Sequence, residues 1–214
     1  MKTMNKNYIE QLIEEGEHVH QDFKFEISDT RKIAKSVSAF ANTEGGRLLV
    51  GVKDNGKIAG VQSEGEMYMI EAAATMYCKP AVQIESTIYK VDGKDVLIVE
   101  IPQCENKPVY ALDENNKPWA YVRIKDENIL ANIVRLNMWK HNAYDREVMV
   151  SYSEREKHLL EVLGEHECLT MNRCSNLAKI PRKEVSRLLA DYIRFDLVEE
   201  IFIDHTFFYR LKDV

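Results

Sequence analysis

Apolar residues repeat along the chain at two spacings, and the clearest repeat predicts a helix over residues 31–42. In RKIAKSVSAFAN the apolar residues stand at i, i+3, i+4, i+7 and i+8, which places them on one face of a helix. These residues are Ile33, Ala34, Val37, Phe40 and Ala41. The polar run at 28–30 supplies a cap for the start of this helix.

Other segments of the first 143 residues alternate between helical patterns and short apolar runs bounded by turn residues. We expect helices over 5–15 and 64–77, and a further helix that opens at 126–128 and continues to about 143. We expect strands over 18–27, 47–54, 57–61, 82–90, 95–101, 108–112 and 119–125. The turns at Asp54-Asn55-Gly56 and Val91-Asp92-Gly93-Lys94 favour antiparallel hairpins. Helices mixed with hairpins predict an α+β fold rather than a repeated βαβ wrap.

The pattern changes after residues 144–153. Three helical segments follow, at 153–166, 169–180 and 181–198, and the tail alternates apolar residues on either side of Asp204-His205. Three short helices followed by a hairpin are the outline of a winged helix-turn-helix. We therefore expect two domains, 1–147 and 148–214, of which the second is a small winged-helix domain.

Composition narrows the possible environments and partners. The 214 residues are 45% hydrophobic and 30% charged, with a net charge of -6, as in an ordinary globular protein. No apolar run approaches the ~18 residues of a membrane span, and the first residues lack a signal-peptide core, so we expect a cytoplasmic protein without membrane contact. An acidic chain can bind nucleic acid only through a local basic patch.

A polar cluster separates the helix at 31–42 from the apolar strand that follows. Asn42 and Thr43 can close the helix end by side-chain bonds to the backbone, while Gly45 and Gly46 permit positive φ and close backbone approach. Gly51 interrupts the strand RLLVGV in the same stretch. This reading gives the cluster a structural role, and a direct ligand role for the glycines is the alternative.

Several motifs in order resemble the AlbA-type domain of bacterial regulators and Schlafen proteins, which is assigned to DNA binding. The resemblance rests on DFK at 22–24, AFANTEGG at 39–46, RLLVGV at 47–52 and KDNGKIAGV at 53–61, and extends loosely through WAYVRI at 119–124. It covers roughly residues 10 to 140. It implies a Schlafen/AlbA-like domain that mixes sheet and helix, followed here by the winged helix.

The Schlafen branch that cleaves RNA implies a second function for three acidic positions. Matched residue by residue, its carboxylates fall on Glu17, Asp22 and Asp54, and oxygen ligands of this kind hold Mg²⁺ or Mn²⁺ in nucleases. The sequence departs from that branch, since Asp22 replaces the usual glutamate and Lys53 stands where a first aspartate is common. Asp54 also fits a plain hairpin turn. A metal-dependent endoribonuclease is therefore the alternative function.

Binding of ATP, another role given to this family, is not expected. The phosphate-binding pattern GxxxxGK[ST] is missing from the sequence, and EGGRLLVG lacks the lysine and hydroxyl that hold phosphate and Mg²⁺. We expect no cofactor, unless the protein is a nuclease that uses Mg or Mn.

The best candidate surface for nucleic acid lies in the third helix of the second half. The segment 179–194 contains five basic residues and only two acidic ones, Glu184 and Asp191. Lys183 and Arg187 stand four apart and so project from one helical face. Residues early in such a helix enter the major groove, where arginine reads guanine and lysine or serine holds phosphates. The candidate residues are Lys179, Arg182, Lys183, Ser186 and Arg187.

The function expected from the sequence is nucleic-acid binding, with DNA favoured over RNA. A transcriptional regulator acting as a homodimer fits a helix-turn-helix, since such proteins commonly pair two half-sites. The alternatives are the metal-dependent nuclease and a protein in which both halves serve as protein-interaction modules. Salt-sensitive duplex binding favours the first function and Mn²⁺-dependent cleavage the second.

Overall fold

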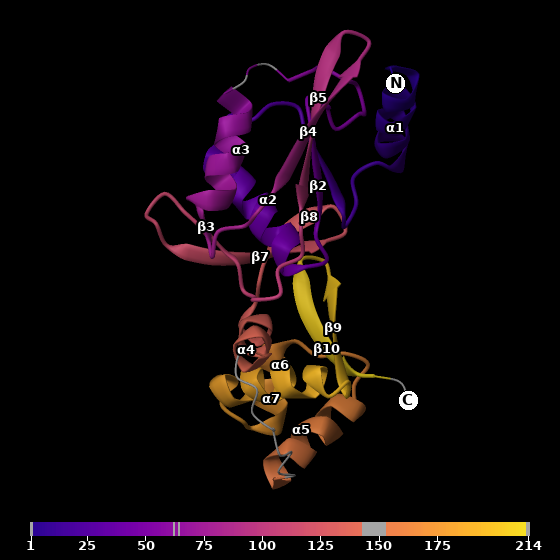
Figure 1. The fold of residues 1–214 in the computed structure, drawn as a ribbon. Helices are drawn as coiled ribbons and strands as arrows, with labels where there is room; N and C mark the ends of the chain where they lie inside the picture. The colour runs from indigo at the N-terminus through magenta and orange to yellow at the C-terminus, as the bar shows by residue number, and fades with distance from the viewer. Residues whose placement is uncertain (1, 62, 64, 143–152, 213–214) are drawn as a thin grey trace. The chain divides into compact units, whose positions relative to one another are not determined.

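The computed structural model describes residues 2–61, 63, 65–142 and 153–212, which form two compact units, Met1–Ala131 and Asn132–Val214. The division lies before helix α4 (Ile133–Asn142), whereas the sequence placed a boundary after it, at 147/148. The physical reason is that α4 packs against α7 (Arg182–Arg194), and its Val134 belongs to the core of the second unit. Figure 1 traces both units from indigo to yellow.

The first unit is a mixed α+β structure built on a four-stranded sheet with the order β1-β2-β5-β4. Strand β1 (Gln21–Lys24) pairs in parallel with β2 (Gly46–Val50), and β5 (Lys94–Ile101) pairs antiparallel with both β2 and β4 (Glu85–Val91). The expected first strand, 18–27, is thus shorter in the structure. The expected hairpin across 54–56 is reduced to a single bridge between Val52 and Ile58.

Both faces of this sheet are covered by helices. Side chains alternate across a strand, so Leu48 and Val50 of β2 join the core under α2 (Thr30–Asn42) and α3 (Gly65–Thr75). Leu49 between them joins Ile9 and Leu12 of α1 (Lys2–Glu15) on the opposite face. The continuous apolar run in β2 is therefore explained by burial on two sides.

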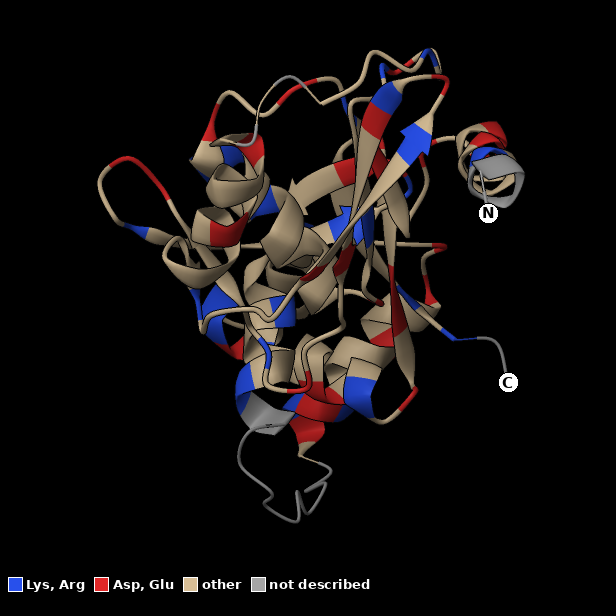
Figure 2. Ribbon diagram, turned by 45° about the horizontal axis from the view of Figure 1, so that its top comes forward, with Lys and Arg blue, Asp and Glu red and all other residues tan. Residues whose placement is uncertain are grey.

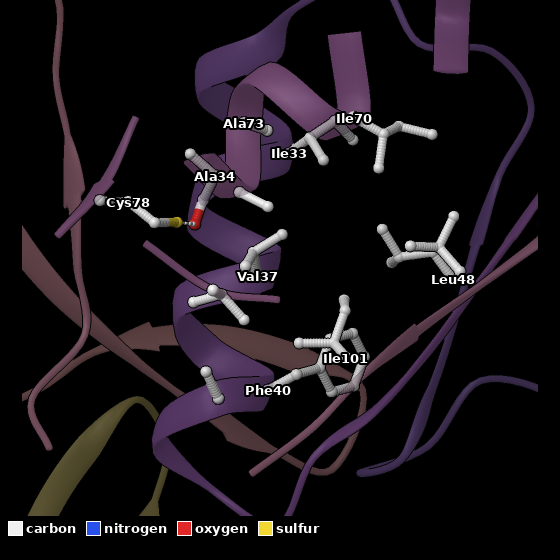
Figure 3. Packing of buried hydrophobic residues seen from close by; sticks show 14 of the residues in the cluster. Ile33, Ala34, Val37, Phe40, Leu48, Ile70, Ala73, Cys78 and Ile101 are labelled. Atoms are coloured by element: carbon white, nitrogen blue, oxygen red, sulfur yellow. Dashed lines mark hydrogen bonds between the residues drawn. The ribbon is translucent and has the colours of Figure 1, made fainter. Parts of the chain in front are cut away.

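Helix α2 is the centre of the first unit. Its N-cap Asp29 accepts hydrogen bonds from the backbone N–H groups of Arg31 and Lys32, as a helix start requires. Figure 3 shows Val37 and Phe40 among the apolar side chains of the sheet and of α3. Nine of its thirteen residues are buried, which is far more than the single apolar face of a surface helix.

A second antiparallel sheet lies against α2, with the strand order β3-β6-β7-β8. Its strands are β3 (Cys78–Lys79), β6 (Tyr110–Leu112), β7 (Pro118–Ile124) and β8 (Glu127–Leu130). Strand β8 corrects the sequence prediction, which began a helix at 126–128. The chain instead turns at Lys125, whose φ is 55°, and Ile129 pairs with Val122 before α4 begins at Ile133.

The polar cluster after α2 joins this helix to the second sheet. The Asn42 amide donates to the carbonyls of Val109 at 2.8 Å and Tyr121 at 2.9 Å, and its Oδ1 accepts from the N–H of Val109 at 2.7 Å. Thr43 donates back to the Ala39 carbonyl at 2.8 Å and accepts from the N–H of Arg123 at 2.8 Å. The bonds of Asn42 thus reach across the fold rather than closing the local helix end.

Glycines are required where the chain leaves this cluster. A Cβ on Gly46 would lie 2.4 Å from the Phe40 ring, so a side chain there would displace a core residue. Gly51 has φ of +89°, and a Cβ there would lie 2.8 Å from the backbone of Gly60. Gly45 also has a positive φ, of +76°. Glycine at these positions lets the chain enter and leave β2 through close backbone contacts.

The second unit contains three helices followed by a hairpin, with α4 packed alongside. The helices are α5 (Glu154–Gly164), α6 (Met171–Ala178) and α7, and the hairpin pairs β9 (Val198–Ile203) with β10 (Thr206–Leu211). Leu169, between α5 and α6, bridges to Tyr209 of β10 through two backbone hydrogen bonds. The helices and the hairpin enclose one apolar core.

None of the helices in the described part of the chain has both the length and the apolar composition needed to cross a membrane.

Candidate nucleic-acid interface and the buried carboxylate pair

Two of the three predicted acidic residues lie together at the start of β1. Asp22 is buried, with 4% exposure, and Glu17 is half-buried. Glu17 Oε1 accepts a hydrogen bond from the N–H of Phe23 at 2.9 Å, and its carboxyl group interacts with that of Asp22. Each of two neighbouring carboxyl groups disfavours the charged form of the other.

The surroundings shift the pKa values of the two carboxyl groups in opposite directions. Burial raises the pKa of Glu17, and its hydrogen bond with Asp22 raises it further. Burial alone would raise the pKa of Asp22 too, but the hydrogen bond from Glu17 and the charges of Lys24 and Arg123 outweigh burial and lower it. Asp22 is therefore the more acidic carboxyl group of the pair, and Glu17 the more readily protonated one.

Two cations neutralise the Asp22 carboxylate. The Lys24 ammonium lies 2.6 Å from Asp22 Oδ2, and Arg123 Nη2 lies 3.4 Å from Oδ1. The Arg123 side chain is only 1% exposed, and it also donates to the Gln21 carbonyl at 3.1 Å and to Asn128 at 3.0 Å. This network connects β1 to the second sheet.

Asp54 does not join the pair. It is exposed, in the turn after Lys53, and no three His, Cys, Asp or Glu side chains of the described residues are grouped so that they could hold a metal ion. In the remaining pair, Asp22 already has Lys24 and Arg123 as cationic partners. The residues present therefore do not fit a divalent metal centre in this arrangement, and we derive no hydrolytic step from them.

The basic residues at the start of α7 are exposed. Arg182, Lys183 and Arg187 have no acidic side-chain partner among the described residues, whereas the two carboxylates of this helix do have cations near them. Glu184 lies 3.2 Å from Arg155 Nη1, and Asp191 lies 3.9 Å from Arg194 Nη1. The exposed part of the helix therefore has an uncompensated positive charge. Figure 2 shows basic and acidic positions interspersed along the ribbon.

Two other predicted nucleic-acid residues lie in different settings. Lys179 is exposed with φ of 55° and ends α6, so it stands outside α7. Ser186 is buried, with 2% exposure. Its hydroxyl donates to the Lys183 carbonyl at 2.9 Å and accepts from the Asn137 amide at 3.1 Å. A phosphate contact was expected from Ser186, and the structure corrects that expectation because its hydroxyl is already bonded.

A groove of about 500 Å³ lies between α4 and the first part of α7. It has four cationic side chains, and no carboxylate is among the described residues that line it. The lining residues are Ile133, Asn137, Lys140, Met171, Arg182, Lys183, Ser186 and Arg187. We call this surface the basic groove.

Sequence reasoning missed the contribution of α4 to the basic groove. The expected boundary at 147/148 assigned this helix to the first domain, so Asn137 and Lys140 were not compared with the basic residues of α7. A signal exists in the spacing, since Ile133, Asn137 and Lys140 stand at i, i+4 and i+7 and so share one helical face.

Comparison with families of proteins matches residues 17–132 to the family described as Schlafen, AlbA_2. No curated protein matches the chain. A solved structure of the N-terminal domain of a protein related to the DNA helicase RecG, from Nitrosomonas europaea, is 23% identical. It aligns with 56% of this chain and 86% of that domain, with a TM-score of 0.43.

The DIP2311 protein from Corynebacterium diphtheriae is 16% identical and has a TM-score of 0.46. The match covers 88% of this chain but only 34% of DIP2311, so this chain spans about a third of that protein's length.

Proposed function

Because the chain belongs to the Schlafen, AlbA_2 family, and its second unit presents uncompensated basic residues on one helix, we propose that this protein binds nucleic acid. Duplex DNA is the favoured partner, and regulation of transcription is the outcome. The observation that carries this proposal is the exposed trio Arg182, Lys183 and Arg187 at the start of α7.

The topology of the second unit supports the same function. Helices α5, α6 and α7 followed by the β9–β10 hairpin have the order of a winged helix-turn-helix, in which the third helix contacts DNA. The bridge from Leu169 to Tyr209 connects the segment between the first two helices to the hairpin. We propose that α7 acts as the recognition helix.

Charge also favours a local interface over general coating of the surface. With a net charge of -6, the protein is repelled by a polyanion everywhere except at a basic patch. A homodimer would place two such patches on adjacent half-sites, as helix-turn-helix proteins commonly do. Sedimentation of the protein with and without DNA tests this dimer directly.

The proposed function is tested by titrating the protein into labelled duplex DNA, single-stranded DNA and structured RNA at two salt concentrations. Buffers with EDTA and with Mn²⁺ are compared. We expect intact duplex to be bound with an affinity that falls as salt rises. RNA shortened only in Mn²⁺ would instead indicate a nuclease.

A charge reversal at two positions locates the interface. The double variant Lys183→Glu, Arg187→Glu should lose duplex binding, because two cations at the start of α7 become anions. The control is Lys90→Glu, Lys157→Glu, which changes the net charge equally at exposed lysines on β4 and α5. Wild-type affinity in the first variant would overturn the proposal.

A further inference from the structure

Helix α7 is exposed over only part of the face that would enter a DNA groove. Arg182, Ser186 and Ala190 stand four residues apart and so continue one helical face. Arg182 is exposed, but Ser186 is 2% exposed and Ala190 is fully buried. This face of α7 is therefore accessible only at Arg182, although the helix continues to Arg194.

Helix α4 is the element beside this face. It packs against α7, and its Asn137 donates the hydrogen bond that occupies the Ser186 hydroxyl. A B-DNA major groove is only about 12 Å wide, roughly the diameter of one helix with its side chains. A duplex that receives the start of α7 must therefore also pass close to α4.

The surface that α4 presents there is suited to a phosphate chain. Lys140 is exposed, has no acidic side-chain partner among the described residues, and lines the basic groove with Arg187. An ammonium group is a compact donor that binds phosphate oxygens without reading bases. The groove thus combines arginines that can reach base edges with a lysine on its other wall.

Helix α4 is also held firmly enough to position that lysine. Glu200 of β9 accepts a hydrogen bond from Asn132 at 2.6 Å, is paired with Arg135, and accepts from the Tyr209 hydroxyl at 3.1 Å. Val134 is fully buried in the core of the second unit. Lys140 therefore stands on a helix that is fixed relative to α7.

We propose that α4 forms the second wall of the nucleic-acid interface and that Lys140 binds a backbone phosphate of the duplex contacted by α7. This inference rests on the proposed function. It adds a helix that a three-helix winged unit does not supply.

The test measures the salt dependence of duplex binding by wild-type protein and by Lys140→Ala. Each phosphate contact contributes about 0.9 to the slope of log affinity against log salt, so the variant should lose about one unit of slope. The loss should be equal for a preferred duplex and for a scrambled one, because a phosphate contact carries no sequence information. Lys157→Ala is the matched control, since it removes an exposed lysine of α5 that lies outside the basic groove.

Two results would overturn the inference while leaving the proposed function intact. One is wild-type slope and affinity in Lys140→Ala, and the other is an equal loss in Lys157→Ala, which would mean a general effect of charge. Failure of the wild-type protein to bind any duplex would overturn the proposed function and this inference with it. A thermal melt of each variant checks that folding is unchanged.

Discussion

Asn42 and Val109 form a reciprocal pair, in which the Asn42 amide donates to the Val109 carbonyl at 2.8 Å and accepts from the Val109 N–H at 2.7 Å. Asn42 is 3% exposed and Val109 is fully buried, so water cannot replace either bond. A third bond from the same amide reaches the Tyr121 carbonyl of β7 at 2.9 Å. One side chain at the end of α2 therefore satisfies three backbone groups of distant segments.

Asn42→Ala should strongly destabilise the protein. The substitution leaves the buried N–H of Val109 without its acceptor and removes a donor from the carbonyls of Val109 and Tyr121, of which the first keeps its bond from the Ser38 hydroxyl. An unsatisfied buried group costs about 1–3 kcal/mol, so we expect a loss of about 2 kcal/mol or more in the free energy of unfolding, measured with urea. Asn106→Ala, at an exposed asparagine of the same unit, should cost less than about 0.5 kcal/mol. Equal losses would contradict the role assigned to Asn42.

The elements with a strong local pattern could be predicted from the sequence. Helix α2 has its apolar face and its Asp29 cap, and the β4–β5 hairpin has its Asp92-Gly93 turn, so each is specified by neighbouring residues. The segment 127–130 was predicted as helix but is strand β8. Its conformation is set by pairing with β7, which is a tertiary contact that local propensity does not contain.

The pH dependence of stability should report the raised pKa of Glu17. Folding raises the pKa of Glu17 above its ordinary value of 4.5, so the folded state binds a proton there more tightly than the unfolded state. Stability from this group is present below pH 4.5 and is lost as pH rises through the raised pKa. Glu17→Gln cannot titrate, so its stability relative to wild type should increase from pH 4.5 towards neutrality.

The pKa of Asp22 shifts in the opposite direction, so Asp22 affects stability at lower pH. Its pKa is lowered from 3.8, so the stability it contributes is present above pH 3.8 and is lost as pH falls through the lowered pKa. Urea unfolding of wild type and Glu17→Gln over this range measures both effects. A constant difference between the two proteins at all pH values would show that Glu17 does not titrate abnormally.

Arg123→Met should be among the most destabilising substitutions in the first unit. The guanidinium is buried beside Asp22, and removing one partner of a buried ion pair costs about 3–5 kcal/mol. Because Lys24 remains near Asp22, we expect the lower part of this range. The double variant Arg123→Met, Asp22→Asn should lose less than the sum of the single variants, since neither charge is then left alone. Additive losses would mean that the two residues act independently.

The candidate sites, like strand β8, depend in part on contacts between elements that a local sequence pattern does not contain. Lys183 and Arg187 were predicted because four-residue spacing places them on one face of a single helix, and Arg182 because it lies beside them. The neutralisation of Asp22 depends on Arg123, which is a hundred residues distant in sequence, and the burial of Ser186 depends on Asn137 of α4. Contacts between elements decided both outcomes, and a residue pattern within one element could not reveal them.

Glu200→Ala should loosen α4 within the second unit. The Glu200 side chain is 6% exposed and paired with Arg135, and it accepts hydrogen bonds from Asn132 and from the Tyr209 hydroxyl. Its removal leaves a half-buried guanidinium and two donors without their acceptor, so we expect a loss of about 2–4 kcal/mol in the free energy of unfolding.

Trypsin should cleave the Glu200→Ala variant faster after Arg135 or Lys140, because a released helix exposes its backbone. Glu199→Ala is the control, since Glu199 pairs with Arg210 in a more exposed setting and should cost no more than about 1 kcal/mol. If α4 carries a phosphate contact, Glu200→Ala should also reduce the salt slope of duplex binding, whereas Glu199→Ala should not. Equal protease sensitivity in the two variants would show that Glu200 does not hold α4 in place.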